Sequence, residues 1–125
     1  MIVTTTASPA HTLGAAGLEM QWRCLARRGM LHSECESVDH VRLPAGAVLD
    51  TSGRAGVESA WFVVAGDGVA TGDGTHSLEQ GDILLTRVTL GWKFQAGEGG
   101  LEMVWLGVLP ESVSGKLPVR KPVVP

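Results

Sequence analysis

The apolar and polar positions of this chain follow the pattern of short β-strands separated by glycine-rich turns. Between residues 46 and 109, short apolar stretches alternate with the pairs Gly66-Asp67, Gly72-Asp73 and Gly81-Asp82. Stiff apolar stretches followed by Gly/Asp turns are typical of antiparallel hairpins. No stretch shows the 3.6-residue periodicity of an amphipathic helix, so the pattern predicts an all-β chain.

The strongest predicted strand is 58–65, in which Trp61-Phe62-Val63-Val64 indicates burial on both faces. The other predicted strands are 18–25, 30–37, 39–43, 47–50, 69–71, 76–78, 82–86, 91–95 and 101–109. Turns are predicted at 66–68 and 72–74, and a hairpin loop at 97–100. Many short strands at this spacing predict a barrel or a sandwich.

Composition narrows the class of protein. The chain has 125 residues, which suits one domain, and 44% of them are hydrophobic, which is enough to build a core. The net charge of -3 and the absence of a basic run argue against nucleic acid as a partner. No apolar run is long enough to cross a membrane and the first residues lack the features of a signal peptide, so we expect a cytoplasmic protein without a membrane partner.

Two cysteines, Cys24 and Cys35, fall on separate predicted strands. In a cytosolic chain of this size we expect them to be reduced and to pack as small apolar groups. A disulfide between neighbouring strands remains the alternative. The sequence contains no CxxC motif and no Cys/His cluster, so it predicts no structural zinc site.

Several glycines fit the spacing of a known two-part motif. The first part is a glycine, five residues, His-x-His, three or four residues, Glu, six residues and Gly; the second is a glycine, five residues, Pro-x-Gly, two residues and His. Gly46 and Gly66 fit the two ends of the first part, and Gly81-Asp82-Ile83-Leu84 opens the second. The chain therefore resembles a small single-domain cupin, which implies a cupin-like antiparallel β-barrel, or jelly roll.

The resemblance also implies a division of the chain and an oligomeric state. The barrel would occupy residues 15–110, after a flexible N-terminal arm at 1–14 and before a C-terminal strap at 111–125. Small cupins pair through sheet edges, so the resemblance implies a homodimer.

The four positions that hold a metal ion in this family carry other residues here. Ser52 and Arg54 fall on the two histidines of the first part, Ser59 falls on its glutamate, and Trp92 falls on the histidine of the second. A transition metal needs several imidazole or carboxylate ligands at one point. We therefore expect a cupin-like barrel with no metal and no other cofactor.

The resemblance further implies an interior walled by aromatic residues. The predicted wall residues are Trp61, Trp92, Phe94, Met103 and Trp105, with Ser52, Arg54 and Ser59 near the opening. Aromatic walls with a few polar groups are typical of a small-molecule site. The alternative is that these tryptophans fill the barrel as its core.

Two groups are candidates for acid–base or anion-binding chemistry. His32 and Glu34, with Glu36, share one face of a predicted strand, and an imidazole titrates near neutral pH. Arg54 could hold a carboxylate or an enolate oxygen through its planar guanidinium. The alternatives are a solvated outer face of an edge strand for the first group and a solvated loop arginine for the second.

These observations lead to one main hypothesis and two alternatives. The main hypothesis is a metal-independent enzyme of secondary metabolism that acts on a hydrophobic small organic metabolite, either polyketide-like or an organic acid. Isomerisation, cyclisation and lyase-type chemistry need a shaped, dry cavity and a proton donor or acceptor, here His32, Glu34 or Arg54. The alternatives are a non-catalytic small-molecule-binding module and a structural dimeric barrel.

Overall fold

The computed structural model describes residues 4–7, 10–14, 18–27, 35–51, 58–86, 91–108 and 116. Within these ranges the regular structure is entirely β-strand, which confirms the all-β prediction. The strands are β1 His11–Leu13, β2 Met20–Arg27, β3 Cys35–Leu43, β4 Val48–Asp50, β5 Glu58–Gly72, β6 Gly74–Glu79, β7 Ile83–Thr86 and β8 Lys93–Val108. A search of the same ranges for a helix long and apolar enough to cross a membrane found none.

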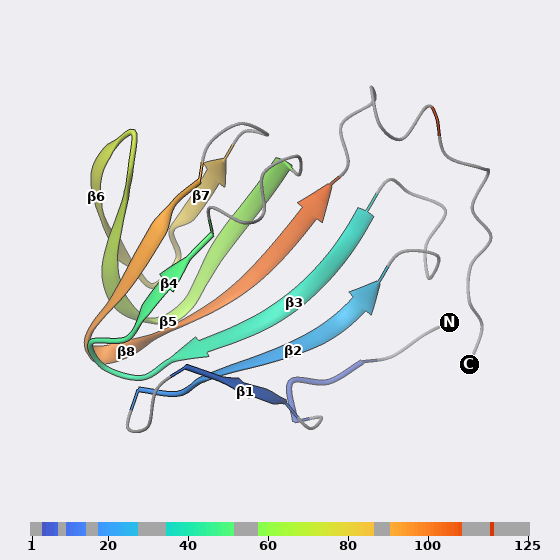
Figure 1. The fold of residues 1–125 in the computed structure, drawn as a ribbon, viewed down its shortest axis with the longest axis horizontal. Coiled ribbons are helices and arrows are strands. Elements are labelled where there is room, and N and C mark those ends of the chain that lie inside the picture. Colours follow the sequence, from blue (N-terminus) through green and yellow to red (C-terminus); the bar gives the residue numbers. More distant parts are fainter. Residues whose placement is uncertain are drawn as a thin grey trace.

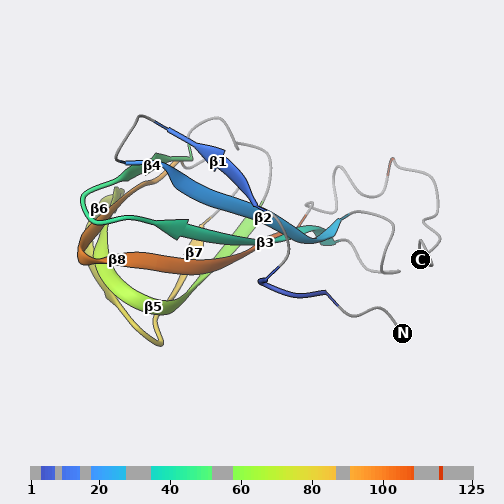
Figure 2. The same cartoon turned by 90° about the horizontal axis from the view of Figure 1, so that it is seen from below.

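The strands form one antiparallel sheet that curls into a two-layered roll. The strand order is β1-β2-β3-β8-β5-β6, with β4 paired to β8 and β7 paired to β5. The two long strands, β5 and β8, bend midway and contribute to both layers (Figure 1). The first half of β5 and the second half of β8 lie with β3 and β7, whereas their other halves lie with β4 and β6. Seen from below, β2, β3, β8 and β5 follow one another in that order (Figure 2).

Glycine makes the bend in β5 and β8 possible. The register passes from Gly66 opposite Leu101 to Gly68 opposite Ala96, so residues 97–100 stand opposite Asp67. Gly66 has a φ of 84°, and a Cβ there would lie 2.2 Å from the carbonyl oxygen of Gly100. Two neighbouring backbones can approach this closely only without a side chain at residue 66.

This bend corrects two sequence predictions. Residues 66–68 do not end a strand, and residues 97–100 are not a hairpin loop, because β5 and β8 run through these points without interruption. The same glycine-rich composition suits a turn that reverses the chain and a corner at which two paired strands bend together. The sequence pattern cannot separate the two cases, because the difference lies in the pairing partner.

The inner face of the roll is set by the register of neighbouring strands. Trp22 on β2 lies opposite Val41 on β3, which lies opposite Met103 on β8, which in turn lies opposite Val63 on β5. All four side chains are buried. The buried core continues through both layers and consists of Met20, Trp22, Val41, Leu43, Ala47, Leu49, Trp61, Val63, Ala70, Leu78, Trp92, Phe94, Ala96, Leu101, Met103 and Trp105.

Three other predictions at the N-terminal side need revision. Residues 39–43 are not a separate strand, because β3 runs from Cys35 to Leu43; residues 30–34 of the predicted 30–37 strand lie outside the described residues. His11–Leu13, within the predicted arm, pair with β2. Cys24, predicted to pack as a small apolar group, is exposed, and the pairing of β2 with β3 shifts just after it. The boundaries predicted at residues 14 and 110 stay predictions.

Candidate functional site

The predicted wall residues come together in the middle of the barrel. The exposed fractions are 1% for Trp61, 5% for Trp92, 2% for Trp105, and 0% for both Phe94 and Met103. The ring of Trp61 lies 4.8 Å from that of Phe94 and 5.7 Å from that of Trp105, measured between centroids. Tilted ring pairs at these distances are favourable contacts. The aromatic rings thus form a continuous inner wall, and its role in binding stays a prediction.

Trp92 is held in the wall by contacts of its backbone and its ring. Its backbone is fixed by Thr51, whose hydroxyl accepts from the Trp92 N–H at 2.8 Å and donates to the Trp92 carbonyl oxygen at 2.7 Å. Its ring lies 5.6 Å from that of His76, between centroids. The indole Nε1–H is buried and has no hydrogen-bond acceptor among the described residues. A buried donor without a partner costs about 1–3 kcal/mol, and an oxygen to which the indole N–H could donate would offset this cost.

A buried carboxylate also faces the interior, and sequence reasoning did not select it. Asp39 is 5% exposed and lies opposite Trp105 on the inner face. Its Oδ2 accepts from the indole Nε1–H of Trp22 at 2.6 Å, and its Oδ1 accepts from the Ser37 hydroxyl. The available signal was the alternation within 39–43, which places Asp39 on the apolar side with Val41 and Leu43.

Two further polar side chains lie at the edge of the inner face. Ser59 and Thr86 are opposite each other in the register of β5 and β7, and each is 9% exposed. A groove of about 530 Å³ lies beside them. It is lined by Glu58, Ser59, Ala60, Leu85, Thr86, Leu106 and Val108. We call the end of the barrel that holds Asp39, Ser59 and Thr86 the rim.

Comparison with known proteins gives a clear answer for the fold. No family model and no curated protein matches the chain. The structure is similar to a predicted oxalate decarboxylase from Thermotoga maritima (TM-score 0.75, 16% identity, 87% of this chain and 100% of that one). It is also similar to a Cupin 2 conserved barrel domain protein from Salinispora arenicola (TM-score 0.71, 9% identity, 92% and 93%) and to the Cnp3 cupin domain of Schizosaccharomyces pombe (TM-score 0.65, 10% identity, 79% and 73%).

The chain folds as a cupin. The predicted cupin-like antiparallel jelly roll is confirmed, because these similarities extend over most of the chain. Sequence identities of 16% or less show the fold of this chain and carry no activity with them.

The donor groups of this chain do not fit a bound transition metal at the two described positions that correspond to metal ligands in the cupin motif. Ser59 offers a hydroxyl and Trp92 offers an indole N–H, and neither replaces a carboxylate or an imidazole as a ligand. The described part of the chain contains no group of three or more His, Cys, Asp or Glu side chains that could hold a metal ion. We derive no chemical step through a metal.

Four of the predicted site residues lie outside the described residues. These are His32, Glu34, Ser52 and Arg54. Their proposed roles as acid–base, anion-binding and rim residues therefore stay predictions. Among the described candidates, the structure brings together Ser59, Trp61, Trp92, Phe94, Met103 and Trp105.

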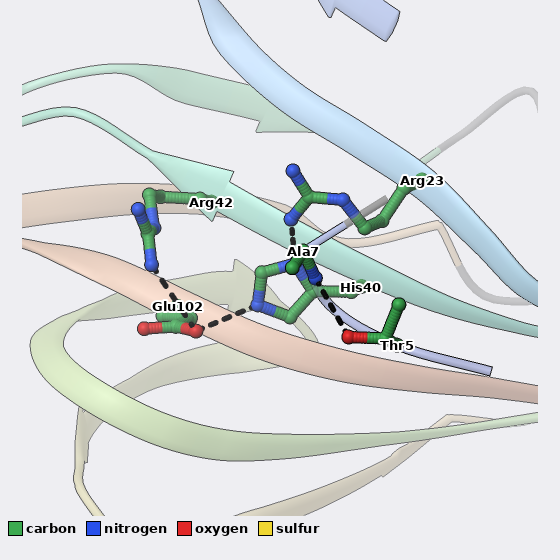
Figure 3. Close-up of polar contacts among 6 residues, drawn as sticks. All are labelled: Thr5, Ala7, Arg23, His40, Arg42 and Glu102. Carbon is green, nitrogen blue, oxygen red and sulfur yellow. Dashed lines mark hydrogen bonds and ion pairs between the residues drawn. The ribbon is translucent and has the colours of Figure 1, made fainter. Parts of the chain in front are cut away.

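A second polar cluster, centred on the buried side chain of His40, lies on the outer face of the barrel (Figure 3). His40 is only 1% exposed, and its Nδ1 lies 2.9 Å from a guanidinium nitrogen of Arg23. Because a guanidinium only donates, Nδ1 accepts, and Nε2–H then donates to Glu102 Oε1 at 2.6 Å. Arg42 approaches the same oxygen at 3.5 Å. The hydrogen bond from His40 and the charge of Arg42 lower the pKa of Glu102, although partial burial opposes the shift.

The lowered pKa of Glu102 predicts a pH-dependent contribution to stability. Its usual value is 4.5, so the stabilisation is fully present above about pH 4.5 and is lost as the pH falls through the lower folded-state pKa. Replacing Glu102 by glutamine should lower the free energy of unfolding at neutral pH by about 1 kcal/mol. Urea unfolding from about pH 7 to about pH 3 should show that this difference shrinks with falling pH.

The matched control for this prediction is Glu98→Gln, which removes the same charge from an exposed position on β8. It should leave stability nearly unchanged across the whole pH range, because exposed charges contribute little. A Glu102→Gln difference that stays constant down to the acid limit would show that the carboxylate charge does not stabilise the fold.

The outer face also carries an apolar surface. Phe62, Ile83, Leu85 and Leu106 are 41%, 61%, 72% and 38% exposed, and they lie on the adjacent strands β5, β7 and β8. Large exposed apolar patches often mark interaction surfaces. The predicted homodimer, which would pair through sheet edges, stays a prediction.

Proposed function

We propose that this protein is a metal-independent enzyme that holds a hydrophobic small organic metabolite against the aromatic wall of its barrel. The observation that carries the proposal is the buried indole N–H of Trp92, which lacks an acceptor among the described residues. A carbonyl or ether oxygen of a ligand would satisfy this donor and offset the cost of its burial. The ligand would therefore contain an acceptor oxygen within an otherwise apolar frame.

The surroundings of Trp92 support a ligand that is mostly apolar. Trp61, Phe94 and Trp105 present aromatic rings, and the polar groups described at the rim are those of Asp39, Ser59 and Thr86. Sites of this composition bind organic molecules mainly by burying their apolar surface, and they orient them with a few hydrogen bonds. A side chain would have to move to admit a ligand, because the wall residues contact one another.

The reaction would be an isomerisation, a cyclisation or a lyase-type step. Such reactions need a fixed geometry, a dry environment and a group that transfers a proton. The donor set at residues 59 and 92 offers nothing to a metal ion, which is why we propose chemistry that uses side chains alone.

Indole N–H signals can test binding directly. The chain has four tryptophans, so a ¹⁵N-labelled sample gives four indole cross-peaks, and the one lost in Trp92→Phe belongs to Trp92. We expect 2-tetralone, a bicyclic ketone with one aromatic ring, to shift this signal. It should bind about fivefold more tightly than tetralin, which has the same frame without the oxygen.

The matched control is Trp61→Phe, which keeps the Trp92 donor and an aromatic ring in the wall. Trp92→Phe should abolish the preference for the ketone, whereas Trp61→Phe should retain it. If neither compound binds to the unmodified protein, the aromatic residues are simply core, and the structural barrel is the correct alternative.

A further inference from the structure

We infer that Asp39 is the acid–base group of this barrel and that its substrate is a neutral molecule with an acidic C–H beside a carbonyl group. The inference rests on the proposed function, since it names the proton-transfer group and the substrate class of the same interior. The candidates predicted from the sequence, His32, Glu34 and Arg54, lie outside the described residues.

The carboxylate of Asp39 lies at an unusual place for a charged group. Asp39 is 5% exposed and shares the inner face with Trp22, Trp105 and Trp61. Removing a charged group from water costs several kcal/mol, and an apolar residue of similar size would fill the same space at lower cost. A carboxylate kept among three indole rings is therefore a weak source of stability and a good candidate for chemistry.

The two carboxylate oxygens of Asp39 accept hydrogen bonds from different partners. Oδ2 accepts from the Trp22 indole, which can only donate. Oδ1 accepts from the Ser37 hydroxyl, whose oxygen also lies 3.2 Å from the carbonyl oxygen of Ala26. One hydroxyl proton cannot serve both acceptors at once, so the Ser37 hydroxyl can turn from one to the other.

This arrangement suits both protonation states of Asp39. When Asp39 is ionised, Ser37 donates to Oδ1. When Oδ1 takes up a proton, the Ser37 hydroxyl can turn to the Ala26 carbonyl oxygen, while Trp22 continues to donate to Oδ2. Oδ1 is therefore the oxygen that exchanges a proton with the substrate, and Ser37 is a positioning residue.

The chemical step balances without a co-reactant. Asp39 Oδ1 takes a proton from the carbon beside the carbonyl; the C–H bond breaks, an O–H bond forms, and the electron pair moves onto the carbonyl oxygen as an enolate. The O–H bond then breaks and the proton returns to another atom of the same molecule. The product is an isomer of the substrate, which agrees with the isomerase class proposed above.

The charge of Asp39 also selects the substrate. A second carboxylate beside it would meet like-charge repulsion in a site with little water. Of the two metabolite classes predicted from the sequence, the neutral, polyketide-like class therefore fits this end of the barrel, and the organic acid does not.

Exchange of deuterium into 2-tetralone tests the inference. In D₂O, the protein should accelerate the uptake of deuterium at the carbon beside the carbonyl, observed by proton NMR. Asp39→Asn keeps an acceptor for Trp22 but cannot take up the proton, so the rate should fall by roughly 100-fold or to that of buffer. Asp73→Asn, an exposed carboxylate at the turn after β5, should keep the full rate.

Ser37→Ala supplies a second readout that does not depend on how Asp39→Asn folds. It leaves the carboxylate in place but removes the turning hydroxyl, so exchange should slow several-fold while binding, measured from the Trp92 indole signal, is retained. An unchanged exchange rate in either variant, with the ketone bound, overturns the role of Asp39 and leaves the proposed function standing. Failure of the ketone to bind overturns both.

Discussion

Replacing Gly66 by alanine should lower the free energy of unfolding by more than about 3 kcal/mol, or prevent folding altogether. The new Cβ would lie 2.2 Å from the carbonyl oxygen of Gly100, and the φ of 84° is one that alanine adopts only with strain. Neither backbone can yield without breaking the pairing of β5 with β8 at the bend. Thermal and urea unfolding followed by circular dichroism would measure the loss.

Gly81→Ala is the matched control for this prediction. Gly81 also has a positive φ, of 94°, but a Cβ there would meet nothing within 4 Å. Gly81→Ala should therefore lower the free energy of unfolding only by the cost of backbone strain, about 1–2 kcal/mol. Equal losses in the two variants would show that backbone strain alone matters and that the close approach of β5 and β8 does not.

Replacing Trp61 by alanine should cost about 3–5 kcal/mol of folding free energy. Its side chain is 1% exposed and contacts both Phe94 and Trp105, so its removal leaves a large cavity between the two layers. The surrounding strands are fixed by their hydrogen-bonded register and can collapse into this space only partly. Chemical denaturation with a constant m-value would give the difference in stability.

The neighbouring residue provides the comparison for Trp61. Phe62 lies on the opposite face of β5 and is 41% exposed, so Phe62→Ala should cost less than about 1 kcal/mol. Similar losses for the two substitutions would mean that the barrel interior is much looser than its contacts imply, and the inner wall could not then position a ligand.

Much of the fold follows from the sequence, because the local signals and the tertiary structure agree. The alternation around Trp61 and the Gly/Asp turns at 72–74 predict strands and a hairpin that the structure contains. The glycine segments at 66–68 and 97–100 mislead, because their local preference for a turn is the same whether the chain reverses or bends. The pairing of β5 with β8 determines whether these segments reverse or bend the chain. The paired residues are distant in sequence, so the local pattern does not contain this information.

The candidate site shows a similar division. The aromatic wall could be predicted, because indole-bearing positions such as Trp61, Trp92 and Trp105 alternate with outward positions on predicted strands. Asp39 could not be identified as a candidate site residue from the sequence alone. Its strand was predicted, but its donors, Trp22 and Ser37, become meaningful only when β2 and β3 are placed side by side.

The passage of β5 and β8 through both layers has a consequence for how this chain can change. Neither layer is a separable module, because each shares two of its central strands with the other. Opening one layer would break the strand pairing of the other layer. The described barrel should therefore unfold as a single cooperative unit. Substitutions in the shared strands should therefore disturb both layers at once, whereas substitutions at the rim, where strands end, should disturb the fold least.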